Sequence, residues 1–491
     1  MKKFLPILIT LLLTACTAGN KVDPGLPELP AADDAATEAQ EIPKTSPALD
    51  VIVFLQVSGM VNSAVFSPDG RYVLTGDESG EVKIWEADTG EHIRTFSGNT
   101  EILHDVSISP DGKYFVTGSN GKKVNIWNIE TGILERSLKI PDSEVYAVAF
   151  SPDSRLVAAG GRLPKIRIWE TETGNELKSL SGHYGSVYAL KFNPEGRYLA
   201  SASGDKTIIM WDLEAGSTVN MNLLYRHEAA VSSLTFSTDG NFLYSGSRDH
   251  MIVIWENIGR EEYYMRNTFT GHRGAVNSVA VNSDDTWIVS GSGDGTVRRW
   301  IIDTGEDEIL ATDTAIRDIA MNGIRSVAIS PDDSSIIAST DYGQIFMWET
   351  GSAWAIRYKG VKDRILGIIN SLCYTSDGKR ILAGFIDGTA RLYNAEDLSE
   401  IACFVYISGK EAEPDALAQG VSQIDGEWFT ITPDGYYQGS PGAGRFINVL
   451  IKDYGLYPMD KVSGFFNRPD VVRSRLAGNS DPEYMPSFAI Q

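Results

Sequence analysis

Histidine, serine and aspartate recur together at three places in this chain, and this combination could carry nucleophilic catalysis. In such a site the aspartate orients the histidine, which takes the proton of an attacking serine hydroxyl. Each set ends at a tryptophan, with the histidine 28, the serine ten and the aspartate six residues before it. The sets are His183, Ser201, Asp205 and Trp211; His227, Ser245, Asp249 and Trp255; and His272, Ser290, Asp294 and Trp300.

The repetition argues against catalysis by these residues. An enzyme does not need three copies of one triad in an identical register. A set repeated in this way is typical of a hydrogen-bond network that satisfies buried polar groups inside a structural repeat. A Cys/His dyad cannot be assembled from the C-terminal region either, because no histidine follows His272 and no cysteine follows Cys403.

The remaining motifs do not indicate metal or cofactor chemistry. Acidic turn pairs such as Asp69-Gly70 recur so regularly that they indicate hairpin turns and not cation sites. The run from Gly291 to Gly295 resembles a phosphate loop, but no helix follows to present its amides to a phosphate. We therefore expect no metal, no cofactor and no enzymatic activity.

The three sets lie inside a longer repeat marked by aromatic residues. These follow one another at intervals of 42 to 48 residues and are Trp85, Trp127, Trp169, Trp211, Trp255, Trp300, Trp348 and Tyr393. An acidic residue lies 16 positions before each aromatic: Asp69, Asp111, Asp153, Glu195, Asp239, Asp284, Asp332 and Asp377. A period near ~40–45 residues that closes on an aromatic is the signature of a β-propeller. Alternating apolar runs separated by turn residues predict an all-β domain.

On these residues the units resemble WD40 repeats over positions 60–400, most clearly in Val187–Asp212 (VYALKFNPEGRYLASASGDKTIIMWD). The resemblance implies four antiparallel strands per blade around a central channel. It also implies that His, Ser, Asp and Trp of each set form a structural network. Eight blades are predicted, with seven or nine as alternatives. Units one to three carry Val57, Asn99 and Pro141 at the histidine position, so we expect blades without the full set to rest on packing alone.

The same resemblance places candidate binding residues on the top rim of the propeller, beside the histidine and just before the aspartate. They are Tyr146, Tyr184, Tyr188, Arg248 and Arg273. Tyrosine and arginine are enriched at protein interfaces because they bury area and still offer hydrogen bonds. An ordinary amphipathic surface is the alternative interpretation of each.

The N-terminus has the pattern of an export signal. Lys2 and Lys3 precede an apolar run of ten residues, Phe4–Leu13, which is too short to span a bilayer as a stable helix. The sequence Leu13-Thr14-Ala15-Cys16 resembles a bacterial lipobox, which implies cleavage before Cys16 and acylation of that cysteine. An ordinary secretory signal with an incidental cysteine is the alternative. Thr17 in place of an aspartate favours the outer membrane, by analogy with enterobacterial sorting.

Four segments are predicted: a signal peptide over residues 1–15, an acylated tether over 16–48, the propeller over 49–407 and a C-terminal extension over 408–491. The tether contains five prolines and no aromatic residue, so it cannot bury enough apolar surface to offset its ordering entropy. The extension contains a degenerate ninth copy, with Asp434 in its turn and Leu450 in place of the aromatic. Its segment 426–478 also resembles one that follows WD40 arrays in bacterial proteins with caspase-like protease domains.

Two strands compete to complete the last blade. In closed propellers the N-terminal strand commonly completes the last blade, and in this chain that strand would be Val51–Val57. The alternative is Ile401–Ile407. Cys373 falls on the innermost strand of the eighth unit and Cys403 on the outermost, about 14 Å away at ~4.8 Å per strand, which is too far for a disulfide. Both thiols are expected to be free.

The chain has a formal net charge of −22 and no cluster of Lys and Arg, which argues against nucleic acid as the partner. The sequence therefore predicts a membrane-anchored, non-catalytic propeller that binds an envelope protein or peptide. The alternatives are an enzyme with its active site in the central channel and a structural component of an outer-membrane protein assembly complex. Partner binding, the first interpretation, rests partly on analogy with WD40 repeats.

Overall fold

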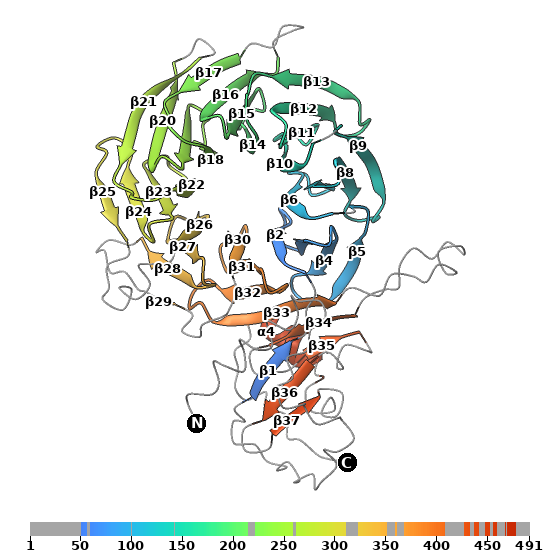
Figure 1. Cartoon of the computed structure of the whole chain (residues 1–491). Helices are drawn as coiled ribbons and strands as arrows, with labels where there is room; N and C mark the ends of the chain where they lie inside the picture. The colour runs from blue at the N-terminus through green and yellow to red at the C-terminus, as the bar shows by residue number, and fades with distance from the viewer. Residues whose placement is uncertain are drawn as a thin grey trace, which may run out of the picture. The chain divides into compact units, whose positions relative to one another are not determined.

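A computed structural model describes the repeat region with short gaps, together with parts of the C-terminal extension (Figure 1). The described residues are 51–55, 59–99, 101–141, 143–214, 221–258, 262–310, 323–350, 359–360, 368–407, 427–432, 437–440, 447–451, 455–458, 467 and 469–477. Cys16, the signal segment and the tether lie outside them, so the calls made on those residues stay predictions.

The described strands of the repeats form eight antiparallel sheets, the blades, arranged in sequence order around a channel (Figure 1). The first strands lie next to the channel: β2 (Val61–Phe66), β6 (Leu103–Ile108), β10 (Val145–Phe150), β14 (Val187–Phe192), β18 (Val231–Phe236), β22 (Val276–Val281), β26 (Ile324–Ile329) and β30 (Ile369–Tyr374). The second strands are β3 (Tyr72–Asp77), β7 (Tyr114–Ser119), β11 (Leu156–Gly161), β15 (Tyr198–Ser203), β19 (Phe242–Ser247), β23 (Trp287–Ser292), β27 (Ser335–Thr340) and β31 (Arg380–Phe385). The prediction of eight blades is confirmed.

The outer half of each blade carries its aromatic residue. The third strands are β4 (Val82–Glu86), β8 (Lys123–Asn128), β12 (Lys165–Glu170), β16 (Thr207–Asp212), β20 (Met251–Asn257), β24 (Val297–Ile301), β28 (Ile345–Glu349) and β32 (Ala390–Asn394). The fourth strands are β5 (His92–Phe96), β9 (Leu134–Lys139), β13 (Glu176–Ser181), β17 (Met221–Tyr225), β21 (Tyr263–Thr270), β25 (Asp307–Ile309), β29 (Lys359–Gly360) and β33 (Glu400–Ile407).

The hydrophobic core lies between neighbouring blades. Second strands are buried on both faces, as in β3, where residues 73–77 are all buried. One cluster joins Leu74 and Ile84 of the first blade to Val106, Phe115 and Trp127 of the second. Burying a side chain of this size stabilises the fold by about 1.5–3 kcal/mol relative to leaving it in water. Packing between blades therefore fixes the ring.

The acidic residue that precedes each aromatic shapes the turn between the first and second strands. Oδ1 of Asp69 accepts a hydrogen bond from the N–H of Arg71 at 3.1 Å, and Gly70 has a φ of 70°. Aspartates in six other blades accept from the N–H two residues further on: Asp111, Asp153, Asp239, Asp284, Asp332 and Asp377. These acids are therefore turn residues, as their spacing indicates.

Antiparallel pairing gives each blade two unlike ends. The top face carries the loop that enters the first strand of each blade and the loop between its second and third strands. The bottom face carries the two remaining turns of each blade, including those that contain the acidic residues just described.

The ring closes through side-chain contacts between the first and eighth blades, not through the N-terminal strand. Nδ2 of Asn370 on β30 donates to the carbonyl oxygen of Val61 on β2 at 3.1 Å, and Oγ of Ser371 donates to that of Ala64 at 2.7 Å. The fourth strand of the eighth blade is β33, which contains the predicted segment Ile401–Ile407, so this segment completes the last blade. The N-terminal β1 (Val51–Leu55) instead pairs with β36 (Ile447–Ile451), which shows that the alternative of closure by the N-terminal strand is wrong.

The C-terminal extension does not build a ninth four-stranded blade in the part that the structure describes. Two of its strands, β34 (Glu427–Ile431) and β35 (Tyr437–Gly439), add to the outer edge of the eighth blade. The segment predicted to hold the degenerate copy supplies β36, which joins β1 and β37 (Gly455–Pro458) in a three-stranded sheet. The helix α4 (Pro469–Leu476) contacts β33 and β35. A strand from before the first repeat and two strands from after the last repeat thus form one sheet.

Candidate functional site

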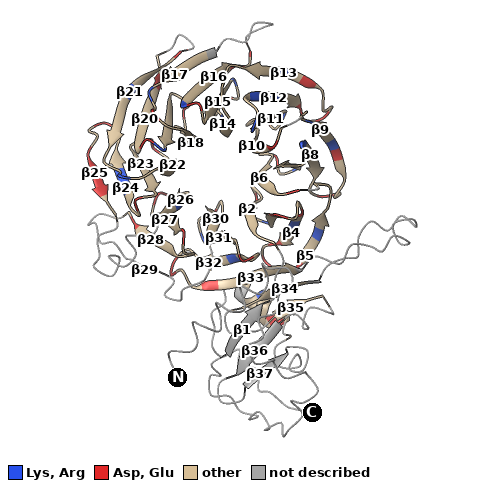
Figure 2. Ribbon diagram, in the orientation of Figure 1, with Lys and Arg blue, Asp and Glu red and all other residues tan. Residues whose placement is uncertain are grey.

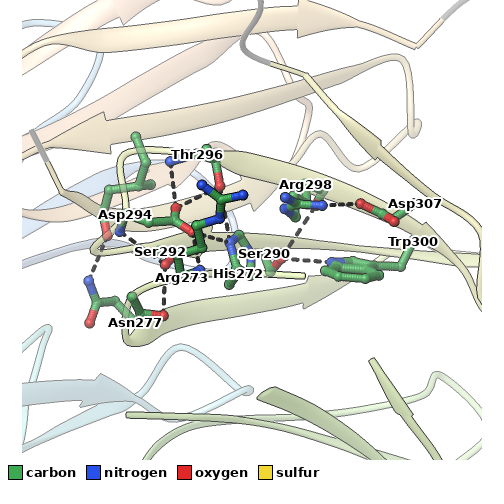
Figure 3. Close-up of polar contacts among 12 residues, drawn as sticks. His272, Arg273, Asn277, Ser290, Ser292, Asp294, Thr296, Arg298, Trp300 and Asp307 are labelled. Atoms are coloured by element: carbon green, nitrogen blue, oxygen red, sulfur yellow. Dashed lines mark hydrogen bonds and ion pairs between the residues drawn. The ribbon is translucent and has the colours of Figure 1, made fainter. Parts of the chain in front are cut away.

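In each of the three sets, consecutive hydrogen bonds link the Trp, Ser, His and Asp side chains. In the fourth blade, Nε1 of Trp211 donates to Oγ of Ser201 at 2.8 Å, and Nε2 of His183 lies 2.7 Å from the same oxygen. Nδ1 of His183 lies 3.0 Å from Oδ2 of Asp205. The fifth blade has the same bonds among His227, Ser245, Asp249 and Trp255. The sixth blade has them among His272, Ser290, Asp294 and Trp300, as Figure 3 shows.

Burial prevents these serines from attacking a substrate. Ser201, Ser245 and Ser290 are each 0% exposed. Each hydroxyl oxygen also accepts a hydrogen bond from the indole N–H of its tryptophan, so one of its lone pairs is already engaged. The order Asp–His–Ser resembles a catalytic triad, but here it joins strands.

The pKa shifts of His183 and Asp294 favour a neutral histidine in the fourth blade and a charged aspartate in the sixth. Burial lowers the pKa of His183, even though Asp205 acts in the opposite direction. Burial also acts to raise the pKa of Asp294, but hydrogen bonds from His272, Thr296 and the backbone N–H of Arg273 outweigh it and lower this pKa.

The aspartates of these sets also fix the loops of the top face. The backbone N–H of Tyr184 donates to Oδ2 of Asp205 at 2.7 Å, and that of Arg273 donates to Oδ2 of Asp294 at 2.6 Å. Because the carboxylate is itself held by a buried histidine, the loop backbone has a defined position. The side chain of Tyr184 then extends into solvent and is 93% exposed.

Polar networks also occur in the first two blades, so the expectation that these blades rest on packing alone is wrong. In the first blade, Nε1 of Trp85 donates to Thr75 at 3.3 Å, and the buried Lys83 forms ion pairs with the buried Asp77 and Glu81. A sequence search for histidine could not find this replacement, because it uses different residue types.

In the second blade, Asn99 stands at the histidine position and bonds to other partners. Its Oδ1 accepts from Thr117 at 3.1 Å and from Nδ2 of Asn125 at 2.8 Å. The indole N–H of Trp127 is buried and has no hydrogen-bond partner among the described residues. The second blade therefore has the tryptophan of the repeat but lacks the hydrogen bond that the indole N–H donates to serine in the complete sets.

An aromatic ladder lies where three neighbouring first strands reach the top face. It consists of His104 on β6, Tyr146 on β10 and Tyr188 on β14, each at the second position of its strand. The rings of His104 and Tyr146 meet edge to face with centroids 5.2 Å apart. Those of Tyr146 and Tyr188 stack with centroids 6.1 Å apart. Both geometries are favourable for aromatic pairs.

The side chains around the ladder include exposed apolar ones. Tyr188 is 39% exposed, and Leu163, in the top loop of the third blade, is 42% exposed. Ile102, just before β6, is 39% exposed. Glu144 accepts a hydrogen bond from the Tyr146 hydroxyl at 2.6 Å and pairs with Arg162 at 2.9 Å. That hydrogen bond and burial raise the pKa of Tyr146 to about 12, so its hydroxyl is a donor at neutral pH.

The structure brings together only some of the predicted rim residues. Tyr146 and Tyr188 touch, and Tyr184 lies on the loop that leads to Tyr188. Arg248 and Arg273 are exposed on the top loops of the fifth and sixth blades, away from this cluster in the ring order. Analogy missed His104, Ile102 and Leu163, although aligning the second positions of the first strands would have identified His104.

The buried carboxylate beside the ladder joins two blades. Asp105 on β6 accepts a hydrogen bond from the N–H of Val148 on β10 at 2.9 Å, and burial raises its pKa. Ser233 makes the same kind of bond to Val279 at 3.1 Å between the fifth and sixth blades. Asp105 therefore occupies a position that elsewhere serves blade-to-blade contact.

Within the described residues, no group of three or more His, Cys, Asp or Glu side chains is arranged to hold a metal ion. The described part of the chain also contains no helix that is long and apolar enough to cross a membrane. Cys373 and Cys403 are both free, as predicted from their strand positions.

Comparisons with known proteins agree with this architecture. The family model described as WD domain, G-beta repeat matches seven segments: residues 53–86, 90–128, 132–170, 174–212, 219–256, 264–300 and 365–394. A designed protein, Ika8, has a similar solved structure with a TM-score of 0.59 and 24% sequence identity, over 69% of this chain and 98% of that one. This likeness concerns the fold alone.

A stretch of 47 residues is 45% identical to an uncharacterized WD repeat-containing protein of Nostoc sp.. The match covers 10% of this chain and 3% of that protein, so it extends to about one repeat and not to the whole molecule.

Proposed function

This chain belongs to the WD40 family of G-beta repeats, and from that premise we propose that it is a non-enzymatic, membrane-anchored scaffold that binds another protein of the bacterial cell envelope. Propellers of this family commonly mediate protein–protein interaction. The single observation that carries the proposal is the partly exposed aromatic ladder with its exposed apolar neighbours on the top face.

Exposed rings on a rigid scaffold are suited to partner binding. Tyr184 and Tyr188 offer large apolar area and hydroxyl groups, with few rotatable bonds to fix on binding. Their backbone is held in place by the buried set of the fourth blade, through the bond from Tyr184 to Asp205. A preorganised surface loses little conformational entropy when a partner binds.

The membrane anchor in this proposal is supported by residues at the N-terminus. A basic start, an apolar run of ten residues and Leu13-Thr14-Ala15-Cys16 form a lipobox-like signal. The proline-rich tether over residues 17–48 would then separate the propeller from an acylated Cys16 by roughly 30 Å, at ~5–6 Å × √n. The absence of aspartate at position 17 favours the outer membrane.

Two alternatives lead to other experimental outcomes. A channel-sited enzyme would need reactive groups that substrate can reach, whereas Ser201 and its counterparts are buried. A structural subunit of an outer-membrane protein assembly complex would give a stable complex on purification. The C-terminal extension resembles a segment found beside caspase-like domains, and in this proposal it serves the propeller and carries no peptidase activity.

The test is photo-crosslinking of the intact, lipidated protein in its native envelope, followed by identification of captured proteins. A specific partner should be captured, and capture should fall when Tyr184→Ser and Leu163→Ser are introduced. Leu177→Ser is the matched control, because Leu177 is also an exposed leucine (53%) and lies on β13.

A Cys16→Ala variant tests the anchor separately, since it should move the protein out of the membrane fraction. Capture of no reproducible partner by the correctly lipidated protein would contradict the scaffold function. Retention of Cys16→Ala in the membrane after carbonate washing would contradict lipid anchoring.

A further inference from the structure

We infer that the ladder sector of the top face, on blades two to four, binds an acidic, extended peptide segment that carries an apolar anchor residue. The ladder sector comprises the aromatic ladder, its exposed apolar neighbours and the basic residues described below. This inference rests on the proposed function and identifies the chemistry of the partner.

The second position of the first strand has a structural task in other blades. Nδ2 of Asn62 donates to the carbonyl oxygen of Leu103 in the next blade at 2.9 Å. The same type of bond, from the second position to the first residue of the next first strand, is made by Ser232 to Val276, Asn277 to Ile324 and Asn370 to Val61. A short polar side chain at this position thus joins neighbouring blades.

In blades two to four the chain has aromatic rings at this position. His104 bonds to Asn120 within its own blade at 2.6 Å, and the Tyr146 hydroxyl bonds to Glu144. The Tyr188 hydroxyl has no hydrogen-bond partner in the described part of the chain, and its ring lies against Gly204, where a Cβ would be 3.2 Å from it. The blade-to-blade bond is therefore replaced by rings that remain open to solvent on the top face.

The apolar side chains beside the rings are also unusual for a surface. Leu163 stands where a complete set has its aspartate, six residues before Trp169, and it is 42% exposed. Together with Ile102, Tyr184 and Tyr188 it leaves apolar area in water that the fold does not need to expose. Exposed apolar area bordered by polar residues marks interaction sites.

The charge of this sector is opposite to that of the whole chain. In its top loops, on β14 and at the first residues of β8 and β12 it carries six exposed cations, against the four described acids Glu101, Asp105, Glu144 and Asp205. The cations are Lys122, Lys123, Arg162, Lys165, Lys191 and Lys206. Of these, Lys123, Lys165, Lys191 and Lys206 form no salt bridge with any described residue. The carboxylate of Glu144 is paired with Arg162, and that of Asp205 is engaged by His183 and Tyr184.

The bottom face has the reverse character. Its turns between the first and second strands contain the aspartates described above. Its turns between the third and fourth strands carry the exposed acids Asp88, Glu130, Glu172, Asp303 and Asp397. Viewed along the channel, acidic and basic residues are both spread around the ring (Figure 2). In a chain of net charge −22, a sector of excess positive charge around apolar rings complements an acidic ligand.

A peptide fits this sector better than a nucleic acid. The facing sides of the Tyr146 and Tyr188 rings are stacked on each other, so no base can enter between them. An acidic peptide could place its anchor on Tyr188 and Leu163 while its carboxylates reach the surrounding lysines.

The test uses a library of random dodecapeptides displayed on phage, selected against the whole protein. Enriched peptides should be rich in Asp and Glu around Trp, Phe or Leu. Synthetic versions should lose about tenfold in affinity in Tyr188→Ser, in Leu163→Ser and in Lys123→Glu. Binding should also weaken as salt is raised. Leu177→Ser and Lys113→Glu, on surfaces outside the sector, should bind as the wild type does, and melting temperatures verify that each variant is folded.

Three results would overturn the inference. They are failure to enrich any peptide, enrichment of basic or uncharged sequences, and equal binding by Leu163→Ser, whose exposed side chain has no role in the core. If a single-stranded oligonucleotide bound more tightly than the peptides, and if Tyr188→Ser weakened that binding, the ligand of this sector would be a nucleic acid and not a peptide. A captured envelope partner that binds elsewhere would leave the scaffold function intact while removing this assignment.

Discussion

The hydroxyl of Thr430 on β34 donates a hydrogen bond to the carbonyl oxygen of Gly90 in the first blade at 2.5 Å. The same strand places Trp428 edge-on to Trp85, with ring centroids 6.2 Å apart. Leu476 of α4 also lies against Gly90, where a Cβ would be 2.8 Å from its Cδ1. Residues that follow the last repeat thus hold the first and eighth blades together across the point where the ring closes.

The Thr430→Val substitution should weaken this closure. It leaves the buried Gly90 carbonyl without its donor and should lower the free energy of unfolding by about 1–3 kcal/mol. Thr235→Val is a suitable control, because Thr235 lies on β18 and its hydroxyl makes no hydrogen bond to any residue that the structure describes. Urea unfolding followed by tryptophan fluorescence measures both, and equal effects would show that the bond to Gly90 does not stabilise the ring.

Replacing the tryptophan of a complete set should cost more than replacing one outside a set. Trp211→Phe removes the bond to Ser201, whereas Trp127→Phe removes an indole N–H that already lacks a partner. Both lose similar volume, so the difference between them isolates the hydrogen bond and should be about 1–3 kcal/mol. The same urea titrations apply, and a larger loss in Trp127→Phe would contradict the assignment of partners.

Acid should destabilise the first blade through His92. Burial, followed by the charge of Lys83, lowers the pKa of His92 to about 4 from an ordinary value near 6.5. The folded state therefore binds fewer protons than the unfolded state, and stability present above pH 6.5 is lost as the pH falls towards 4. His92→Phe keeps a ring beside Trp85 and should lose less stability between pH 7 and pH 5 than the wild type does.

The measurement for His92 is the unfolding midpoint in urea at each pH. His250→Asn provides the control, because His250 is exposed and its left-handed φ of 73° suits asparagine. It should retain the acid sensitivity of the wild type. An identical pH dependence in His92→Phe and wild type would assign the acid sensitivity to other groups.

Both cysteines of the propeller should be unreactive until the protein unfolds. Burial raises the pKa of Cys373 and of Cys403 to about 12, so almost no thiolate exists at pH 8. Ellman's reagent should therefore label neither thiol in the folded protein and both in 6 M guanidinium. Rapid labelling of either thiol in the native state would mean that its strand opens readily.

The sequence by itself determined the repeat and the turn residues and favoured eight blades, and the tertiary structure excluded the alternatives of seven and nine. These features are local, because strand alternation, the Asp-Gly turn and the aromatic residue recur within a few tens of residues. The sequence of each repeat therefore specifies its own strands and turns. The three complete sets could be recognised in the same way, since their spacing is constant. Their lack of nucleophilic character followed from repetition and is explained by the burial of Ser201.

Only the tertiary structure decided how the ring closes and which residues share a surface. The pairing of β1 with β36 and the bond from Thr430 to Gly90 join segments hundreds of residues apart, and no local pattern encodes such a contact. The ladder arises because His104, Tyr146 and Tyr188 occupy one position in successive blades, a coincidence of register that becomes a surface only when the blades pack side by side. The ion cluster of Lys83 was likewise hidden, because burial and charge pairing depend on what the fold places around a residue.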